Sequence, residues 1–345
     1  MNQKRIRVAV NGYGVIGRRV ADAVNVQPDM ELVGVADVSS DWRVQAALTK
    51  GYRLFGVDNN VMAAMKEAGL EVSGALIDLL SKADVVVDCA PKKVGAANAK
   101  IYTEHKVKFI VQGGEKHETT GHSFVAEANY ESAIGRDSTR VVSCNTTSIV
   151  RTLTALKRAG LLKKARGTLL RRATDPWESH KGGIMNTVLP ESKIPSHQGP
   201  DAQSVDPSLD VITMAVMVPE TIGHVHFWNV ELTRNSTREE VLAAFGESSR
   251  IAFVRMDQGL TGINTIKELM ADVGRSRDNL YEVAIWEDLV EVKGSELFYA
   301  YMVDNQAIVI PETIDAIRAL SKSTKSATES MSRTNEALDL KRRFM

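Results

Sequence analysis

The stretch VAVNGYGVIG, residues 8–17, starts as an apolar run and then places glycines at positions 12, 14 and 17. The residues that continue it, VIGRRVADAV at 15–24, are apolar at helical spacing. Glycines allow a tight turn between a strand and a helix, so this order predicts a strand, a turn and a helix in direct succession. Such a unit is the first building block of an α/β fold.

Further apolar runs follow in the first half of the chain. They are ELVGVA at 31–36, ADVVVDCA at 83–90 and VKFIVQ at 107–112, with helix-compatible segments between them. Strands that are apolar without alternation are typical of a parallel sheet covered on both faces. We therefore expect residues 1–143 to form a Rossmann-type doubly wound parallel sheet.

The second half has a different pattern. Alternating strands are expected at HVHFWNVEL (224–232) and LYEVAIW (280–286), and a hairpin with a Lys-Gly-Ser turn at VEVKGSELFYAYMV (290–303). The segment TTSIVRTLTALKRAGLL (146–162) reads as a helix that ends near Gly160. An α+β catalytic domain with a mostly antiparallel sheet is predicted over residues 144–306.

The remaining segments are a loop and two helices. Residues 175–220 hold six of the nine prolines and are expected to form a long polar loop. Pro311 is expected to start a helix, PETIDAIRAL, and residues 326–343 to form a last amphipathic helix.

Composition excludes several classes of protein. Lys plus Arg equals Asp plus Glu at 43 each, so no basic field favours nucleic acid or an anionic membrane. No apolar run has the roughly 18 residues of a membrane span. Two cysteines provide neither a disulfide framework nor a four-cysteine zinc site, and a cytoplasmic location is expected.

The glycine turn predicts a dinucleotide site. Gly12, Gly14 and Gly17 let the backbone approach a pyrophosphate, which the following helix N-terminus stabilises. Asp37 ends the next strand, 20 residues after Gly17, where a carboxylate binds the adenosine ribose of NAD and repels the 2′-phosphate of NADP. NADP stays open, because the serines and arginine of SSDWR (39–43) could accommodate a phosphate. A turn used only for helix–strand packing is the alternative.

Cys144 lies where an apolar strand ends and a helix begins. The unpaired N–H groups there are expected to lower the thiol pKa, and Asn145, Thr146 and Thr147 can cap the helix or donate to an oxyanion. A thiolate beside a nicotinamide adds to an aldehyde, and loss of hydride leaves a thioester. Cys89, inside an apolar strand, is expected to be an inert core residue.

The reaction needs a base near the sulfur. His224 and His226 are two apart on a predicted strand and so share a face. One of them is expected to be the base and the other a packed or hydrogen-bonded partner. A metal pair is the alternative, but the sequence offers no third ligand, so we expect no metal.

At this point the chain resembles archaeal-type phosphorylating glyceraldehyde-3-phosphate dehydrogenase, almost from end to end. The segments that carry the resemblance are NGYGVIGRRVADAV, GYRLF, VQGGEKHE, SCNTTSIVRTL, RRATDP, PSHQGPD and PETIDAIRAL. The resemblance implies that Cys144 is the nucleophile, with Ser143 and Asn145 lining the aldehyde site. It places His197 and Gln198 at the substrate phosphate.

The same resemblance implies cofactor contacts beyond the glycine turn. They are Val15 and Ile16 at the turn itself, and Gly114, Arg172 and Gln306 elsewhere in the chain.

The implied reaction begins when Cys144 attacks the aldehyde of glyceraldehyde 3-phosphate and His224, favoured over His226, takes the proton. Hydride passes to NAD or NADP, and inorganic phosphate cleaves the thioester to 1,3-bisphosphoglycerate, a step of glycolysis and gluconeogenesis. The resemblance also implies a homotetramer built on the sheet face of the second domain, with C-terminal helices, 307–345, returning to the dinucleotide-binding domain.

Two features depart from the family pattern. Relatives often carry two adjacent histidines where this chain has His197 and Gln198, and many have a basic residue in place of Asp37. In the bacterial and eukaryotic branch the base histidine follows the cysteine closely. The nearest candidate here, His180, lies in a polar stretch and reads as loop.

Two other functions remain open from the sequence. A semialdehyde dehydrogenase, such as aspartate semialdehyde dehydrogenase, would share the glycine turn and the cysteine but would need a cationic clamp for a carboxylate. A dinucleotide-binding redox sensor would use Cys144 as an oxidisable switch without turnover.

Overall fold

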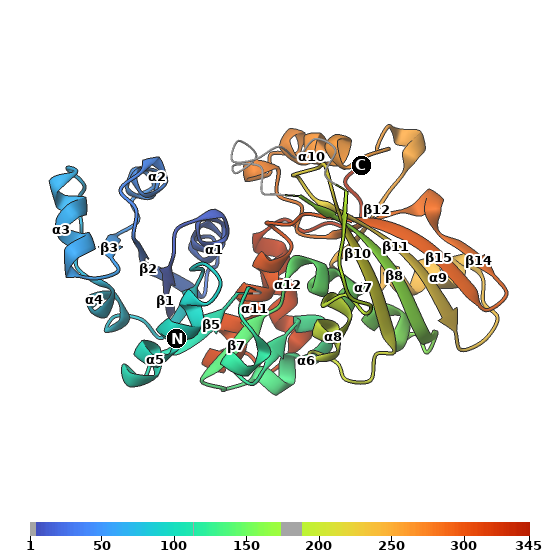
Figure 1. Cartoon of the computed structure of the whole chain (residues 1–345), viewed down its shortest axis with the longest axis horizontal. Coiled ribbons are helices and arrows are strands. Elements are labelled where there is room, and N and C mark those ends of the chain that lie inside the picture. Colours follow the sequence, from blue (N-terminus) through green and yellow to red (C-terminus); the bar gives the residue numbers. More distant parts are fainter. Residues whose placement is uncertain (1–4, 113, 174–187) are drawn as a thin grey trace. The chain divides into compact units, whose positions relative to one another are not determined.

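A computed structural model describes the chain at residues 5–112, 114–173 and 188–345 (Figure 1). Within these ranges no helix is long and apolar enough to cross a bilayer. The loop expected around His180 lies outside the described residues.

The first sheet has parallel strands throughout, in the order β3-β2-β1-β4-β5-β7-β6. Its members are β1 (Ile6–Asn11), β2 (Met30–Asp37), β3 (Leu54–Gly56), β4 (Val85–Asp88), β5 (Lys108–Val111), β6 (Ser123–Phe124) and β7 (Ser138–Val141). The order runs outward from β1 in both directions, so the carboxyl ends of β1 and β4 lie side by side at the switch point. The predicted doubly wound parallel sheet is confirmed.

Helices cover both faces of this sheet. They are α1 (Val15–Asn25), α2 (Trp42–Thr49), α3 (Asn59–Glu67), α4 (Leu76–Leu80), α5 (Val94–Glu104) and α6 (Ala126–Ala133). Ala9 and Val86 face a core that α4 and α5 complete. Their strand neighbours Val8, Val10 and Val87 point to the other face and are equally buried. Apolar residues on both faces explain why these strands do not alternate.

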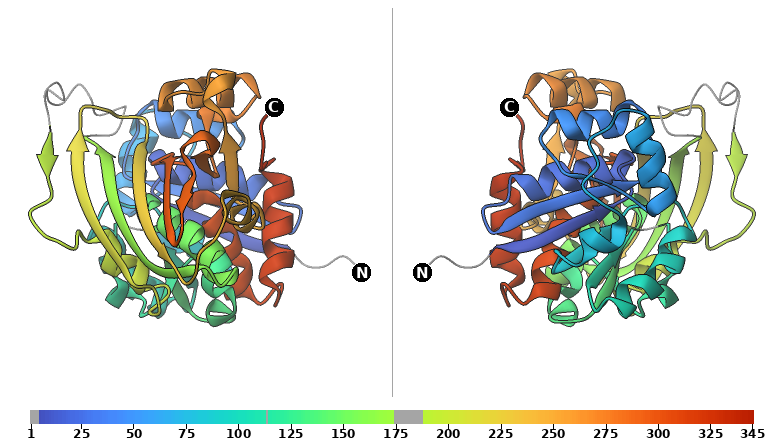
Figure 2. Two further views of the ribbon diagram at one scale, coloured as in Figure 1. Left: turned by 90° about the vertical axis from the view of Figure 1, so that its right-hand side faces the viewer. Right: turned by 90° about the vertical axis from the view of Figure 1, so that its left-hand side faces the viewer.

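Two C-terminal helices complete the covering of this sheet. α11 (Val309–Ser321) lies beside α1 and α6, and α12 (Ala327–Ala337) lies beside α11 and α6 (Figure 2). The buried Arg318 guanidinium donates to the Asp29 carboxylate at 2.8 Å and thereby joins α11 to the start of β2. α11 begins two residues before the predicted Pro311. α12 ends well before the predicted residue 343, because Asp339 takes a left-handed conformation with φ of +53°.

The second sheet is mixed and mostly antiparallel, in the order β12-β13-β15-β11-β8-β10-β9 with β14 paired to β15. Among the described strands of this second sheet, only the pairs β8–β10 and β12–β13 are parallel. Its members are β8 (Leu162–Arg172), β9 (Leu189–Pro190), β10 (Val211–Val218), β11 (His224–Leu232), β12 (Ile251–Val254), β13 (Val283–Trp286), β14 (Glu291–Lys293) and β15 (Glu296–Val303). The predicted hairpin is confirmed as β14–β15.

Within the described residues four α-helices accompany this sheet: α7 (Cys144–Arg158), α8 (Gln198–Gln203), α9 (Arg238–Gly246) and α10 (Ile263–Asp272). α7 packs against β8, β13 and β15, on the face of the sheet that we call the inner face. The opposite face is called the outer face. The long loop predicted over 175–220 is wrong for its described part, which holds β9, α8 and β10. The prolines that suggested a loop do not interrupt these elements. Pro190 ends β9, Pro200 lies in the first turn of α8, Pro207 precedes β10 and Pro219 follows it.

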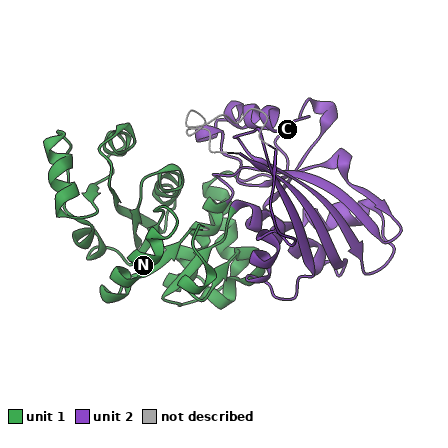
Figure 3. Ribbon diagram, in the orientation of Figure 1, with its two compact units in different colours: residues 1–143, 309–339 green, residues 144–308, 340–345 purple. Residues whose placement is uncertain are grey.

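The chain divides into two compact units (Figure 3). Unit 1 comprises residues 1–143 and 309–339, and unit 2 comprises residues 144–308 and 340–345. α11 and α12 therefore belong to unit 1. The last six residues belong to unit 2, where the backbone N–H of Lys341 donates to Glu282 at 2.7 Å.

Candidate active site

Cys144 and His224 meet in unit 2. Cys144 is the first residue of α7, and His224 is the first residue of β11. The Cys144 Sγ lies 3.2 Å from the His224 Nε2. A cysteine and a histidine 80 residues apart in sequence are thus held at hydrogen-bond distance, which is the arrangement of a nucleophile and its proton partner.

The other ring nitrogen of His224 has a fixed partner. The backbone N–H of Arg172 donates to His224 Nδ1 at 3.1 Å. Burial, followed by the nearby His226 and Arg172, holds the pKa of His224 well below its usual value. The ring is therefore neutral, and since Nδ1 accepts, its proton is on Nε2, facing the sulfur.

The thiol pKa does not follow the sequence expectation. Part of the Cys144 surface is accessible, yet burial of its sulfur raises the pKa to about 11. Arg172, the backbone N–H of Asn145 and Arg171 each act in the opposite direction. The expected helix N-terminal effect is thus present, but the prediction of a lowered pKa is wrong because desolvation of a thiolate is the larger effect.

His226 has different partners from His224. Its Nε2 lies 2.8 Å from Asn145 Oδ1, and its Nδ1 lies 2.8 Å from the Tyr301 hydroxyl. Burial, with a smaller effect of Arg171, lowers its pKa to about 3. Hydrogen bonds therefore occupy both nitrogens of each strand histidine, and no group of three or more metal-binding side chains occurs in the described ranges.

The first turn of α7 surrounds the sulfur with polar groups. The Asn145 amide nitrogen lies 3.8 Å from Cys144 Sγ, and Ser143, directly before the helix, is partly exposed. Thr146 does not face a reaction site, because its buried hydroxyl donates to Asp201 in α8 at 2.7 Å. That bond joins α8 to the first turn of α7.

The two residues expected at the substrate phosphate differ in their surroundings. Gln198 begins α8 and is fully buried, yet neither atom of its amide has a hydrogen-bond partner within the described residues. His197 is exposed and contacts the Glu191 carboxylate through Nδ1 at 2.6 Å. Glu191 also contacts Arg171 at 3.4 Å. A buried amide without partners is suited to a polar ligand.

The glycine turn in unit 1 has the geometry of a phosphate cradle. Gly12 has φ of +91°, and a Cβ there would lie 2.9 Å from the Ala90 nitrogen. A Cβ on Gly17 would lie 1.8 Å from the Gly12 oxygen, so only glycine lets α1 pack this closely on β1. Gly14, the N-cap of α1, faces open space, and Val15 and Ile16 form the partly exposed first turn. A pyrophosphate fits this open helix end.

Asp37, the last residue of β2, is held beside this turn. Its two carboxylate oxygens accept from the backbone N–H groups of Tyr13 at 2.6 Å and Ser39 at 2.8 Å. Arg43, which could have bound a phosphate, is paired with Asp41 instead. That pairing lowers the pKa of Asp41 to about 2.

The other expected cofactor residues are spread over both units. Gly114 is an exposed turn residue of unit 1. In unit 2, Arg172 ends β8 and Gln306 follows β15, where its backbone N–H donates to Asp304 at 2.8 Å.

Sequence reasoning misses three residues around the cysteine: Arg171, Asp201 and Tyr301. Alternation along β15 places Tyr301 on the inner face, but no spacing rule links it to His226 across the sheet. Arg171 is paired with His224 in the β8–β11 register, which likewise becomes visible only in the fold.

Comparisons with known proteins identify relatives over nearly the whole chain. The family described as "Glyceraldehyde 3-phosphate dehydrogenase, C-terminal domain" matches residues 143–288, and "Dihydrodipicolinate reductase, N-terminus" matches residues 6–146. The chain is 44% identical to a glyceraldehyde-3-phosphate dehydrogenase of Methanococcoides burtonii, over 97% of this chain and 99% of the relative. It is 43% identical to the glyceraldehyde-3-phosphate dehydrogenase of Haloarcula marismortui, over 98% of this chain and 95% of the relative. With the protein of the same name from Methanothermus fervidus the identity is 40%, over 96% and 98%.

Proposed function

Because the chain belongs to the archaeal-type glyceraldehyde-3-phosphate dehydrogenase family, we propose that its two units together oxidise glyceraldehyde 3-phosphate with NAD(P) and capture the acyl group on inorganic phosphate. The observation that carries this proposal is the 3.2 Å contact between Cys144 Sγ and His224 Nε2 at the start of α7. This contact joins a cysteine, the nucleophile that a thioester-forming oxidation requires, to a histidine that can transfer its proton.

Each step can be assigned to residues of this chain. The Cys144 sulfur adds to the aldehyde carbon, and the carbonyl oxygen becomes the hydroxyl of a thiohemiacetal. NAD(P), when bound, would supply the hydride acceptor for this carbon. The hydroxyl proton would pass to His224 as the hydride leaves, so that a thioester remains on Cys144. A phosphate oxygen attacks the thioester carbon, the carbon–sulfur bond breaks, and 1,3-bisphosphoglycerate leaves while the thiol re-forms. A thioester is used because it is opened more readily than an ester of serine.

His224 is proposed to accept and release the proton of the reaction, because His224 contacts the sulfur and His226 contacts Asn145 instead. To accept a proton at Nε2, the neutral ring must first carry its own proton on Nδ1. In that tautomer Nδ1 can no longer accept the hydrogen bond from the Arg172 backbone N–H, so this bond is lost. That cost and burial keep the resting pair as a thiol and a neutral imidazole. A ring with so low a pKa releases an accepted proton readily.

Cofactor choice is proposed to favour NAD over NADP. The bonds from Tyr13 and Ser39 fix the Asp37 carboxylate and leave each oxygen a second lone pair for a ribose hydroxyl. The same carboxylate repels a 2′-phosphate. Arg43 does not offset this repulsion, because Asp41 neutralises it.

The substrate phosphate is proposed to bind at the start of α8. Gln198 offers a buried amide without partners among the described residues, and its NH2 group can donate to a phosphate oxygen. The hydrogen bond between Thr146 and Asp201 anchors α8 to the helix that carries Cys144. His197 is exposed and supplies a second donor when its ring is turned away from Glu191.

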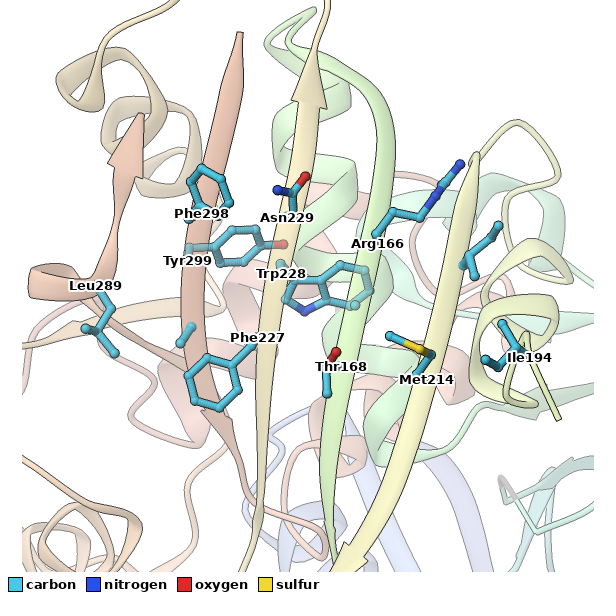
Figure 4. Close-up of a pocket in the computed structure, with 13 residues that line it drawn as sticks. Arg166, Thr168, Ile194, Met214, Phe227, Trp228, Asn229, Leu289, Phe298 and Tyr299 are labelled. Atoms are coloured by element: carbon cyan, nitrogen blue, oxygen red, sulfur yellow. The ribbon is translucent and has the colours of Figure 1, made fainter. Parts of the chain in front are cut away.

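The outer face of the second sheet supports self-association, and membership of the family implies that the assembly is a homotetramer. Ile212, Met214, Phe227 and Phe298 are large apolar side chains exposed by about two-fifths or more, around a hollow of about 510 Å³ (Figure 4). Apolar patches of this kind are typical of protein interfaces. We propose that a second copy of the chain covers this face. A cytoplasmic location is proposed as well, because the catalytic thiol must stay reduced and both cysteines are free.

The test is an absorbance assay of nicotinamide reduction with glyceraldehyde 3-phosphate, run in parallel with NAD and NADP, with and without phosphate. We expect phosphate-dependent turnover, faster with NAD, and none with Cys144→Ser. Turnover without phosphate would replace the phosphate step by hydrolysis. A folded protein that binds NAD but gives no turnover would contradict the proposed substrate and favour a semialdehyde or a sensor role.

A further inference from the structure

Three buried side chains form a hydrogen-bonded series that ends at the sulfur. The Tyr301 hydroxyl in β15 lies 2.8 Å from His226 Nδ1 in β11. His226 Nε2 lies 2.8 Å from Asn145 Oδ1 in α7, and Asn145 Nδ2 lies 3.8 Å from Cys144 Sγ. Tyr301 and His226 are completely buried, and Asn145 nearly so.

The direction of these bonds is determined by chemistry. An amide oxygen cannot donate, so His226 Nε2 must carry the proton that binds Asn145 Oδ1. Because the pKa of His226 is about 3, the ring is neutral and its Nδ1 has only a lone pair. Tyr301 must then donate to Nδ1, and burial raises the pKa of Tyr301, which keeps the hydroxyl protonated. Every donor in the series points toward the sulfur.

We propose that Tyr301 and His226 are positioning residues that fix the Asn145 amide with its NH2 group, not its oxygen, toward Cys144. The inference rests on the proposed function only in taking Cys144 as the nucleophile. If the amide turned over, Oδ1 would face the sulfur and oppose the thiolate. The same NH2 group also lies where it can donate to the oxyanion that forms when the sulfur adds to an aldehyde.

The contacts around the amide leave its orientation to Tyr301 and His226. Among the described residues, the Asn145 amide contacts His226 through its oxygen and the sulfur through its nitrogen. Ser148 Oγ is a weaker alternative acceptor for the Tyr301 hydroxyl, because it lies at 3.3 Å and His226 Nδ1 at 2.8 Å. The Ser148 hydroxyl itself donates to the backbone carbonyl of Asn145 at 2.8 Å. Without the tyrosine hydroxyl, His226 could place its proton on Nδ1 and accept from the Asn145 amide instead.

The charged and titratable groups that act on the sulfur come from three other places. They are His224 in β11, Arg171 and Arg172 at the end of β8, and Asp304 after β15. The hydrogen bonds that join Tyr301, His226 and Asn145 run through a separate set of atoms. A change in Tyr301 is therefore expected to reach the thiol through Asn145.

The experiment measures alkylation of Cys144 by iodoacetamide between pH 7 and 11, by mass spectrometry of its peptide. Tyr301→Phe removes the hydroxyl and keeps the ring. We expect the apparent thiol pKa to rise by about one unit, and alkylation at pH 8 to slow about tenfold, because one hydrogen bond to a charged group is lost. The kcat should fall while KM for glyceraldehyde 3-phosphate stays within about twofold.

The matched control is Tyr299→Phe. Tyr299 lies two residues away on the same face of β15 and is almost as buried, but its hydroxyl contacts Thr152 at 3.2 Å and not His226. Its loss should leave the alkylation profile unchanged. Alkylation needs neither substrate nor cofactor, so it decides the inference even if the chain fails to oxidise glyceraldehyde 3-phosphate.

A double variant separates positioning from general loosening of the core. Asn145→Ala removes the donor, and in that background Tyr301→Phe should have no further effect on the thiol pKa. Equal effects of Tyr301→Phe and Tyr299→Phe, or additive effects with Asn145→Ala, would overturn the inference. If Tyr301→Phe does not fold, His226→Leu and His226→Gln decide instead. Only Gln keeps a donor for Asn145, so equal alkylation rates of these two would overturn it.

Discussion

The two faces of the second sheet use neighbouring residues of the same strands for opposite purposes. Along β11, His224 and His226 are buried and hydrogen-bonded, whereas Phe227 between His226 and Trp228 is 46% exposed. The inner face holds polar groups where water is scarce, and the outer face holds apolar groups where water is abundant. Buried polar side chains and exposed apolar ones are both exceptions to the usual distribution, and each therefore indicates a function.

The polar inner face is stable because its groups satisfy one another. His224 binds the Arg172 backbone, and His226 binds both Asn145 and Tyr301. The apolar side chains of the outer face do not satisfy one another in this way. Met214 in β10, Phe227 in β11 and Phe298 in β15 line one hollow that is open to water (Figure 4). Chemistry is thus expected from the inner face and self-association from the outer one.

The largest expected effect is on the inner face. His224→Ala should lower kcat by about 10²–10⁴-fold, because it removes the proton partner 3.2 Å from the Cys144 sulfur. Steady-state rates with saturating glyceraldehyde 3-phosphate, NAD and phosphate measure this loss. The outer-face contacts should be unaffected, so the mass in solution should not change.

His224→Gln tells proton transfer from hydrogen bonding. Glutamine can place an NH2 group near the position of Nε2, but it cannot accept and release a proton in the working range. We expect a loss close to that of His224→Ala. Activity within about threefold of the wild type would contradict proton transfer and leave His224 as a hydrogen-bond donor.

A weaker effect, on assembly, is expected on the outer face. Met214→Glu with Phe227→Glu places two charges in the proposed interface and should weaken self-association by about 100-fold or more. Light scattering after size exclusion should show a shift from tetramer toward smaller species. Ile77→Glu in α4, at 45% exposure a matched control, should leave the mass unchanged. A tetramer that survives the double change would place the interface elsewhere.

The last prediction concerns pH. With its pKa raised to about 11 by burial, Cys144 is mostly thiol at neutral pH, and its thiolate fraction grows as pH rises. Alkylation should therefore accelerate about tenfold per pH unit between pH 7 and 10. The outer-face variant should show the same profile. A rate that levels off near pH 8 would mean that the arginines and the helix end outweigh burial.

The first sheet is more predictable from the sequence than the second. Strands such as β1 and β4 are apolar on both faces, a pattern that is typical of parallel strands covered by helices and rare elsewhere. β10 escapes prediction because its outward residues Ile212 and Met214 are apolar too, so no alternation marks it, and prolines surround it. Apolar residues on the outer face of β10 remove the alternation that would mark it as a strand, and the same residues favour an interface.

The candidate site is predictable in part. Cys144 is indicated by its place at a strand–helix junction, and the two strand histidines by their shared face. The contact of His224 with the sulfur, the partnership of His226 with Tyr301, and the raised thiol pKa depend on strand register and burial. These quantities arise only when segments distant in sequence pack together.

The most direct test of the central role of Cys144 is to trap the acyl group. The full-length enzyme is mixed with glyceraldehyde 3-phosphate and NAD in the absence of phosphate, quenched in acid and mapped by mass spectrometry. We expect one phosphoglyceroyl group on Cys144, which disappears on addition of phosphate and never forms in Cys144→Ser. Turnover with no acyl group on the protein, or acylation of Cys89 instead, would contradict it.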